Sequence, residues 1–121
     1  MLQEYLGIRQ EPGTFRRFFS DERFHLYVWY THERGHVVGF QLVVLEAGEP
    51  DHALTWEPSK GSVYTGVWTE DEELVVSPSP VLVADGLLPK SELLALFQEA
   101  SSSLEPELRR LVLQRIEAHG G

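Results

Sequence analysis

Residues 24–45 constrain the fold most, because they predict two long antiparallel strands whose two faces are both largely apolar or aromatic. Along the first strand, one alternating set begins at Phe24 and the other includes Tyr27 and Trp29. Alternate side chains of a strand lie on opposite faces of the sheet. A solvated face would carry Lys, Glu and Thr, and the face with Tyr27 and Trp29 does not. We therefore expect a helix, a second subunit or a ligand on that face.

The turn between these strands predicts one register. Glu33-Arg34-Gly35 is typical of a three-residue hairpin loop with Gly35 in the left-handed conformation, and it sets His32 opposite His36. The predicted pairs are Tyr30 with Val38, Val28 with Phe40, Leu26 with Leu42, Phe24 with Val44 and, on the reverse face, Trp29 with Gly39. A slip by one residue would mix apolar and polar partners, so pattern and turn agree.

Strand patterns fill the first two thirds of the chain and helix patterns fill the last third. This segregation predicts one α+β domain over residues 1–121, with an antiparallel meander of five to six strands followed by two C-terminal α-helices packed on the sheet. Beside the hairpin, strands are expected at residues 14–19, 53–57, 62–69, 74–77 and 81–84. Helices are expected from Pro89 through Ala100 and from Ser103, as N-cap, to the glycines at 120–121.

Composition excludes several classes of site. The absence of cysteine rules out disulfides, thiolate zinc sites, iron–sulfur clusters and cysteine nucleophiles. A formal net charge of −9 opposes nucleic-acid binding. Residues 1–10 lack a basic start with an apolar core, and no apolar run approaches the roughly 20 residues of a membrane span. We expect a cytoplasmic protein that binds neither nucleic acid nor membrane.

No cluster of residues predicts a catalytic, cofactor or metal site. His32 and His36 could share a cation across the hairpin, with Glu33 as a third ligand, but two assured ligands are too few. His25 and His52 could approach each other at the other end of the hairpin, although no serine lies in a nucleophile-elbow motif. The acids at 70–73 are typical of a solvated turn, and no glycine-rich phosphate loop occurs. We therefore predict no cofactor.

The aromatic face is the strongest candidate for function. Three alternatives remain open for it: burial within the monomer under a helix or the N-terminal segment, a homodimer interface, or a small-molecule pocket. If the strand at 14–19 pairs so that Phe18 joins the core, the interface or ligand face comprises Phe15, Arg17, Phe19, His25, Tyr27, Trp29 and Gln41. The leading hypothesis is a non-enzymatic module that associates with itself or with another protein. The alternative is a small-ligand-binding or enzymatic domain that uses this face and a histidine.

Four short stretches carry a resemblance to known proteins. They are RFFSD at 17–21, LYVWY at 26–30, GFQL at 39–42 and ALTW at 53–56. Together they resemble short bacterial proteins of uncharacterised families that share an aromatic-rich meander, over about the middle third of the chain. The resemblance supports the hairpin, implies no activity and transfers no functional residue.

Three biases in composition predict a heat-adapted source. Asparagine is absent, methionine occurs only at position 1, and arginine outnumbers lysine, which is confined to Lys60 and Lys90. We expect the purified protein to melt above the range of about 45–65 °C in which mesophilic domains cluster. Differential scanning calorimetry checks this, and a melting temperature inside that range contradicts it.

Overall fold

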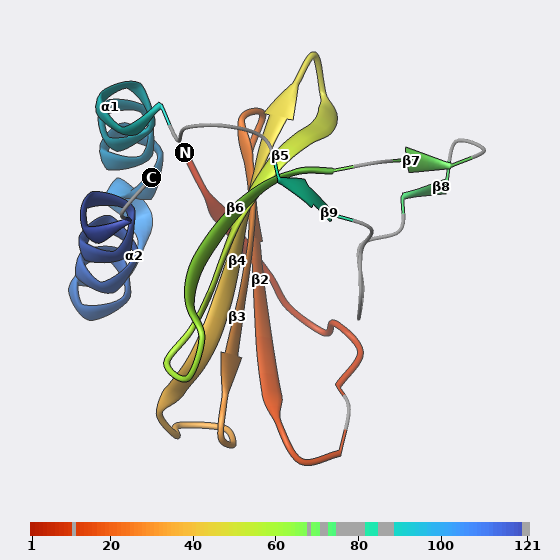
Figure 1. The fold of residues 1–121 in the computed structure, drawn as a ribbon. Helices are drawn as coiled ribbons and strands as arrows, with labels where there is room; N and C mark the ends of the chain where they lie inside the picture. The colour runs from red at the N-terminus through yellow and green to blue at the C-terminus, as the bar shows by residue number, and fades with distance from the viewer. Residues whose placement is uncertain (11, 68, 71–72, 75–81, 85–88, 120–121) are drawn as a thin grey trace.

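The computed structural model describes residues 1–10, 12–67, 69–70, 73–74, 82–84 and 89–119. Its seven-stranded antiparallel sheet has the order β1-β2-β3-β4-β5-β6-β9, and both helices lie on one side of it (Figure 1). This arrangement confirms the predicted α+β class: β1 to β6 form the meander, and β9 adds to its β6 edge. The strands of the sheet are β1 (Gln3–Tyr5), β2 (Phe15–Ser20), β3 (Phe24–Tyr30), β4 (Val37–Glu46), β5 (Glu49–Glu57), β6 (Gly61–Val67) and β9 (Leu82–Ala84).

The remaining elements follow the predicted order. A separate two-stranded pair is formed by β7 (Thr69–Glu70) and β8 (Glu73–Leu74), so the strand expected at 62–69 is divided between β6 and β7. Residues 71–72, 75–77 and 81, which belong to the predicted acidic turn and to two predicted strands, lie outside the described residues. The helical elements are α1 (Lys90–Ala100), the 3₁₀ turn η1 (Ser101–Ser103) and α2 (Pro106–Ala118). Within the described residues, no helix is long and apolar enough to span a membrane.

The central hairpin has the predicted register over most of its length. The pairs that match are Phe24 with Val44, Leu26 with Leu42, Val28 with Phe40 and Trp29 with Gly39. Beyond Trp29 the register shifts, and Tyr30 pairs with Val37 instead of Val38. An extra residue on one strand produces such a bulge and increases the local twist.

The hairpin turn differs from the prediction in the residue that is left-handed. Arg34 has the positive φ of 70°, and Gly35 does not. Thr31 N–H donates to the carbonyl of His36, so His32 is not the partner of His36. Gly35 is required for a different reason: a Cβ there would lie 2.0 Å from Thr31 Oγ1. The close approach of the two chain segments, and not a left-handed backbone, excludes a larger residue.

The hydrophobic core lies between the helices and one face of the sheet. Phe24, Leu26 and Val28 are fully buried on the sheet side, and the rings of Phe24 and Phe97 meet edge to face at 5.8 Å between centroids. The helices bury residues at helical spacing, which are Leu93, Phe97 and Ala100 of α1 and Leu108, Val112 and Ile116 of α2. Burial of each large apolar side chain favours folding by about 1.5–3 kcal/mol, so this layer holds the helices to the sheet.

Strand β2 turns the other face to the core than the sequence predicted: Phe18 was expected on the core side. Phe18 pairs with Tyr27, and Phe19 pairs with Leu26. Phe19 is only 4% exposed and belongs to the core, so the placement of Phe18 on the core side is wrong. A change of one residue in register moves every side chain of a strand to the other face, and neighbouring phenylalanines make both registers apolar.

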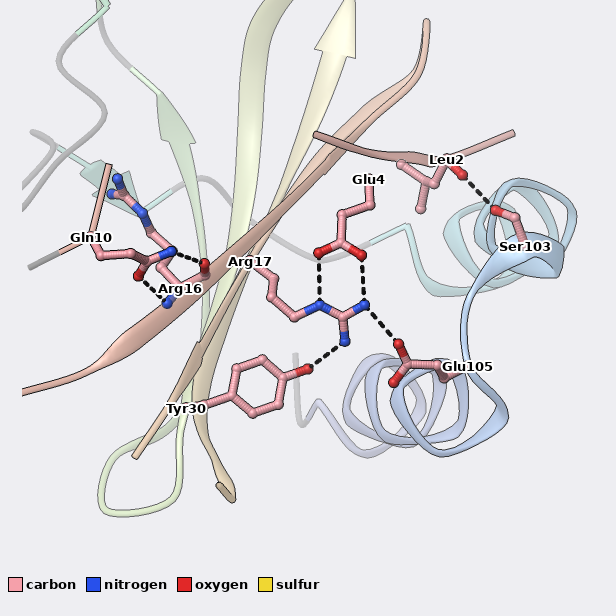
Figure 2. A network of polar contacts seen from close by, with 8 residues as sticks. All are labelled: Leu2, Glu4, Gln10, Arg16, Arg17, Tyr30, Ser103 and Glu105. Atoms are coloured by element: carbon pink, nitrogen blue, oxygen red, sulfur yellow. Dashed lines mark hydrogen bonds and ion pairs between the residues drawn. The ribbon is translucent and has the colours of Figure 1, made fainter. Parts of the chain in front are cut away.

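The N-terminal segment is tied to the connection between the helices. Leu2 is buried, its N–H donates to the carbonyl of Ala100, and its carbonyl accepts from Ser103 Oγ (Figure 2). Ser103 lies in η1, and the N-cap of α2 is Glu105. The prediction that Ser103 caps the helix is therefore wrong, because its hydroxyl donates to the carbonyl of Leu2, the residue before β1, a strand that sequence patterns did not indicate.

Truncation of Phe97 is expected to lower the stability of the protein strongly. We expect Phe97→Ala to lower the free energy of unfolding by about 3–5 kcal/mol, because the ring is fully buried against Phe24 and leaves a cavity. The exposed neighbour Glu99 provides a control on the same helix, and Glu99→Ala should change stability by no more than about 0.5 kcal/mol. Urea denaturation measures both, and equal effects would contradict the assignment of the core.

Candidate functional site

A row of aromatic rings crosses the sheet face opposite the helices, here called the outer face. Tyr5 pairs with Phe18, and Phe18 pairs with Tyr27, so the three side chains share this face. Ring centroids are 5.6 Å apart for Tyr5 and Phe18, 4.7 Å for Phe18 and Tyr27, and 6.0 Å for the stacked pair Tyr27 and Trp29. We call these four residues the outer aromatic row. Their spacing is that of interacting aromatic pairs.

The outer aromatic row is only partly covered. Tyr5 is 53% exposed, and Phe18, Tyr27 and Trp29 are of intermediate exposure. The helices pack on the opposite face (Figure 1), so neither covers the row. Tyr5 is the contribution of the N-terminal segment to this face. Partial desolvation raises the pKa of the Tyr27 phenol, with an opposing effect of Arg16, and keeps the hydroxyl protonated as a hydrogen-bond donor.

The rest of the outer face on β1 to β4 combines apolar and polar residues with one arginine, Arg16. Gln41, the partner of Tyr27, is buried and its amide donates to Thr55 Oγ1 over 3.2 Å. The structure describes all of β1 to β4, and strand pairing shows which of their residues face outward as far as the β4–β5 bulge. These residues are Gln3, Tyr5, Arg16, Phe18, Ser20, His25, Tyr27, Trp29, Gly39, Gln41 and Val43. None of these is acidic, although the chain carries 19 acidic residues. On the neighbouring strand β5 the same face carries Thr55 and the acidic Glu57, whose Cγ lies 3.6 Å from the position of a Cβ on Gly39.

His25 belongs to the outer face and contacts the aromatic row. Its ring meets that of Phe18 edge to face at 5.4 Å. Burial lowers the pKa of His25, and the carboxylate of Asp21 offsets part of this effect. The predicted approach of His25 to His52 does not occur: His25 pairs with Val43 and His52 with Val44, which places them on opposite faces. His52 instead stacks on Tyr64 at 5.1 Å.

Arg17 lies on the helix side of the sheet and organises a network of polar contacts (Figure 2). Its Nε and Nη2 donate to the two carboxylate oxygens of Glu4 over 2.9 and 2.7 Å. Nη2 also donates to Glu105 over 2.6 Å, and Nη1 donates to the Tyr30 hydroxyl over 3.2 Å. The guanidinium stands 4.9 Å from the Phe19 ring centroid. Chiefly the Glu4 contact raises the pKa of Arg17. We call this network the Arg17 clamp.

The Arg17 clamp joins four elements that are distant in sequence. Glu4 comes from β1, Arg17 from β2, Tyr30 from β3, and Glu105 from the N-cap of α2. A bidentate guanidinium–carboxylate pair is both strong and directional. The clamp therefore positions the N-terminal strand and the second helix on the sheet, and its partners saturate the donors of Arg17 that face them.

The predicted interface residues are thus divided between two faces. His25, Tyr27, Trp29 and Gln41 lie together on the outer face as predicted. Phe15, Arg17 and Phe19 pair with Tyr30, Val28 and Leu26 and lie on the helix side. Sequence reasoning missed Tyr5 and Phe18 as members of the row. The adjacent phenylalanines at 18–19 could have indicated a ring on the outer face, because neighbouring residues of a strand face opposite ways and one of the two must point away from the core.

The histidines of the turn do not gather ligands. His32 and His36 are both exposed, and His32 Nδ1 lies 3.0 Å from Thr31 Oγ1. Among the residues that the structure describes, no three His, Asp or Glu side chains are grouped closely enough to hold a metal ion.

Comparison with protein-family models, with curated proteins and with solved structures found no match to this chain. The resemblance to uncharacterised bacterial families stays a prediction. The functional proposal below therefore rests on the residues and contacts of the two sheet faces.

The Arg17 clamp predicts a defined loss of stability. We expect Arg17→Met to lower the free energy of unfolding by about 1–3 kcal/mol, because it leaves Glu4 without its bidentate partner in a partly buried place. Arg23→Met, at an exposed position, is the matched control. Chemical denaturation measures both. If Arg17→Met combined with Glu4→Gln costs the sum of the single variants, the two residues are not coupled and the clamp is refuted.

His25 predicts a pH dependence of stability. Its folded-state pKa is lowered below the ordinary value of 6.5, so the unfolded chain binds the proton first and stability falls as the pH drops through about 6.5. We expect the loss of unfolding free energy between about pH 7.5 and pH 5 to be smaller in His25→Gln than in the parent protein. His36→Gln, at an exposed histidine, is the control. Identical pH profiles of His25→Gln and the parent would contradict this expectation.

Proposed function

We propose that this chain is a cytoplasmic, non-enzymatic module that associates with a second copy of itself through the outer aromatic row. The observation that carries the proposal is the continuous row from Tyr5 to Trp29 on the one sheet face that the helices leave open. Contiguous, partly exposed rings on a soluble protein are typical of association surfaces, where Tyr, Trp and Phe are enriched.

The charge distribution supports a second copy as the occupant. Two chains of net charge −9 repel each other at most orientations. Up to the β4–β5 bulge, the outer face of β1 to β4 has no carboxylate and carries Arg16, so contact through these strands avoids the pairing of like negative charges. A twofold interface needs one patch that is complementary to itself, and a row of stacking rings with polar groups at its ends can satisfy that requirement.

Arg16 is held in a position that suits this contact. Its Nη2 donates to the carbonyl of Arg9 over 2.8 Å, and its backbone exchanges hydrogen bonds with the Gln10 side chain (Figure 2). These contacts fix the side chain at the border of the outer aromatic row beside its strand partner Trp29. An ordered arginine loses less conformational entropy when it enters an interface.

The alternative, a small-ligand-binding or enzymatic domain, would have to use the outer face as well. Core side chains occupy the space between the sheet and the helices, and Arg17 is saturated within its clamp. His25 is the titratable group that contacts the aromatic row on the outer face. A ligand of this site would be a flat, apolar molecule that stacks on Tyr27 and Trp29, and its binding would quench tryptophan fluorescence.

Self-association gives the test of this proposal. We expect a dimer in sedimentation equilibrium at micromolar concentrations, and we expect Tyr27→Glu to weaken the dimer at least tenfold because it buries a carboxylate among rings. Gln114→Glu adds the same charge at an exposed position of α2 and should leave the dimer intact. Circular dichroism confirms that both variants fold. A parent protein that is strictly monomeric at high micromolar concentration contradicts the proposal.

A further inference from the structure

A second cluster of polar side chains lies where the C-terminal end of α2 meets strands β5 and β6. Arg115 lies in the last turn of α2, and His119 is the C-cap residue of the same helix. Trp56 and Ser62 are paired across β5 and β6, with Trp56 on the helix side of the sheet. The guanidinium of Arg115 stands 4.7 Å from the Trp56 ring centroid, and His119 Nδ1 is 2.7 Å from Ser62 Oγ. All four residues therefore form one cluster.

Arg115 is incompletely satisfied in this cluster. Its Nε is buried and has no hydrogen-bond acceptor in the part of the chain that the structure describes. The other arginines with buried or partly buried donors have acceptors: Arg17 binds two carboxylates, and Arg109 binds Ser101 Oγ over 3.0 Å and the Gln98 carbonyl over 3.0 Å. A buried donor without an acceptor costs about 1–3 kcal/mol, so a shift of the guanidinium that gives Nε an acceptor is favoured.

The charges around this position are positive. The ammonium of Lys90, at the start of α1, acts on His119 together with burial, which is the larger cause, to lower the pKa of the imidazole. None of the ion pairs described for this chain involves Arg115. Arg115 thus stands over Trp56, His119 contacts the Ser62 hydroxyl, and Lys90 is near enough to act on the imidazole, in a protein with 19 acidic residues.

We propose that Arg115, His119 and Ser62 form a binding site for a tetrahedral oxyanion such as a phosphate group. The planar guanidinium offers parallel N–H donors that match two oxygens of such an anion. The Trp56 ring stacks on the guanidinium and fixes its orientation. Ser62 Oγ and His119 Nδ1 are hydrogen-bonded to each other, so this end of the cluster keeps one further donor, either the hydroxyl or the second ring N–H of His119. Lys90 adds longer-range attraction.

A purely structural role makes the opposite prediction. The C-terminal end of a helix carries partial negative charge, which basic side chains in the last turn offset. If Arg115 and His119 only served that purpose, the cluster would bind no anion. The experiment below separates the two roles.

Inorganic phosphate is the probe, added to the full chain at constant ionic strength with chloride as the reference salt. We expect saturable shifts of the amide resonances of Ser62 and His119 in nuclear magnetic resonance spectra, in the millimolar range. Arg115→Gln should weaken phosphate binding at least tenfold. Arg110→Gln removes the same charge from an exposed position of the same helix and should change the affinity less than twofold.

A second variant keeps the test valid if Arg115→Gln disturbs packing on Trp56. Ser62→Ala removes one hydroxyl and should weaken phosphate binding several-fold while the melting temperature stays near that of the parent. Shifts that do not saturate, or equal weakening by Arg115→Gln and Arg110→Gln, overturn the proposal, because they show only the general response of a charged surface to salt.

Discussion

The burial of one face of the β3–β4 hairpin under the two helices is the constraint on which the rest of the structure depends. Phe24, Leu26 and Val28 are fully buried there, and Phe97 of α1 packs directly on Phe24. A single layer of helices covers only one face of a sheet. The second face, which the same strands carry by alternation, is not covered by the helices, and its rings at Phe18, Tyr27 and Trp29 are partly exposed.

The Arg17 clamp stabilises that arrangement at its margin. The core holds the helices against the sheet without specifying their exact direction, because hydrophobic contacts are not directional. The contacts of Arg17 with Glu4, Tyr30 and Glu105 are directional and join β1 and α2 to the sheet. A polar network of this kind adds geometric specificity to a core that supplies most of the free energy. The clamp thus serves the fold on the helix side of the sheet.

Two surfaces with different chemistry follow from this architecture. The outer aromatic row is partly exposed, and the outer-face residues of β1 to β4 up to the β4–β5 bulge include no carboxylate; this is the surface through which we propose self-association. The cluster around Arg115 lies at the end of α2 on the helix side, and its positive groups suit a small anion. Their separation on opposite faces means that either site can be altered without direct contact with the other.

The α+β order of elements and the pairing of Phe24 with Val44 could be predicted from the amino-acid pattern, since alternation and turn length are local properties. Which of the phenylalanines at 18–19 enters the core depends on packing and could not be predicted in this way. Both registers of β2 are apolar, and the choice depends on contact with β3 and with β1. The Arg17 clamp could not be predicted from the sequence for the same reason. Glu4 and Glu105 are 101 positions apart, and only packing brings them to one guanidinium.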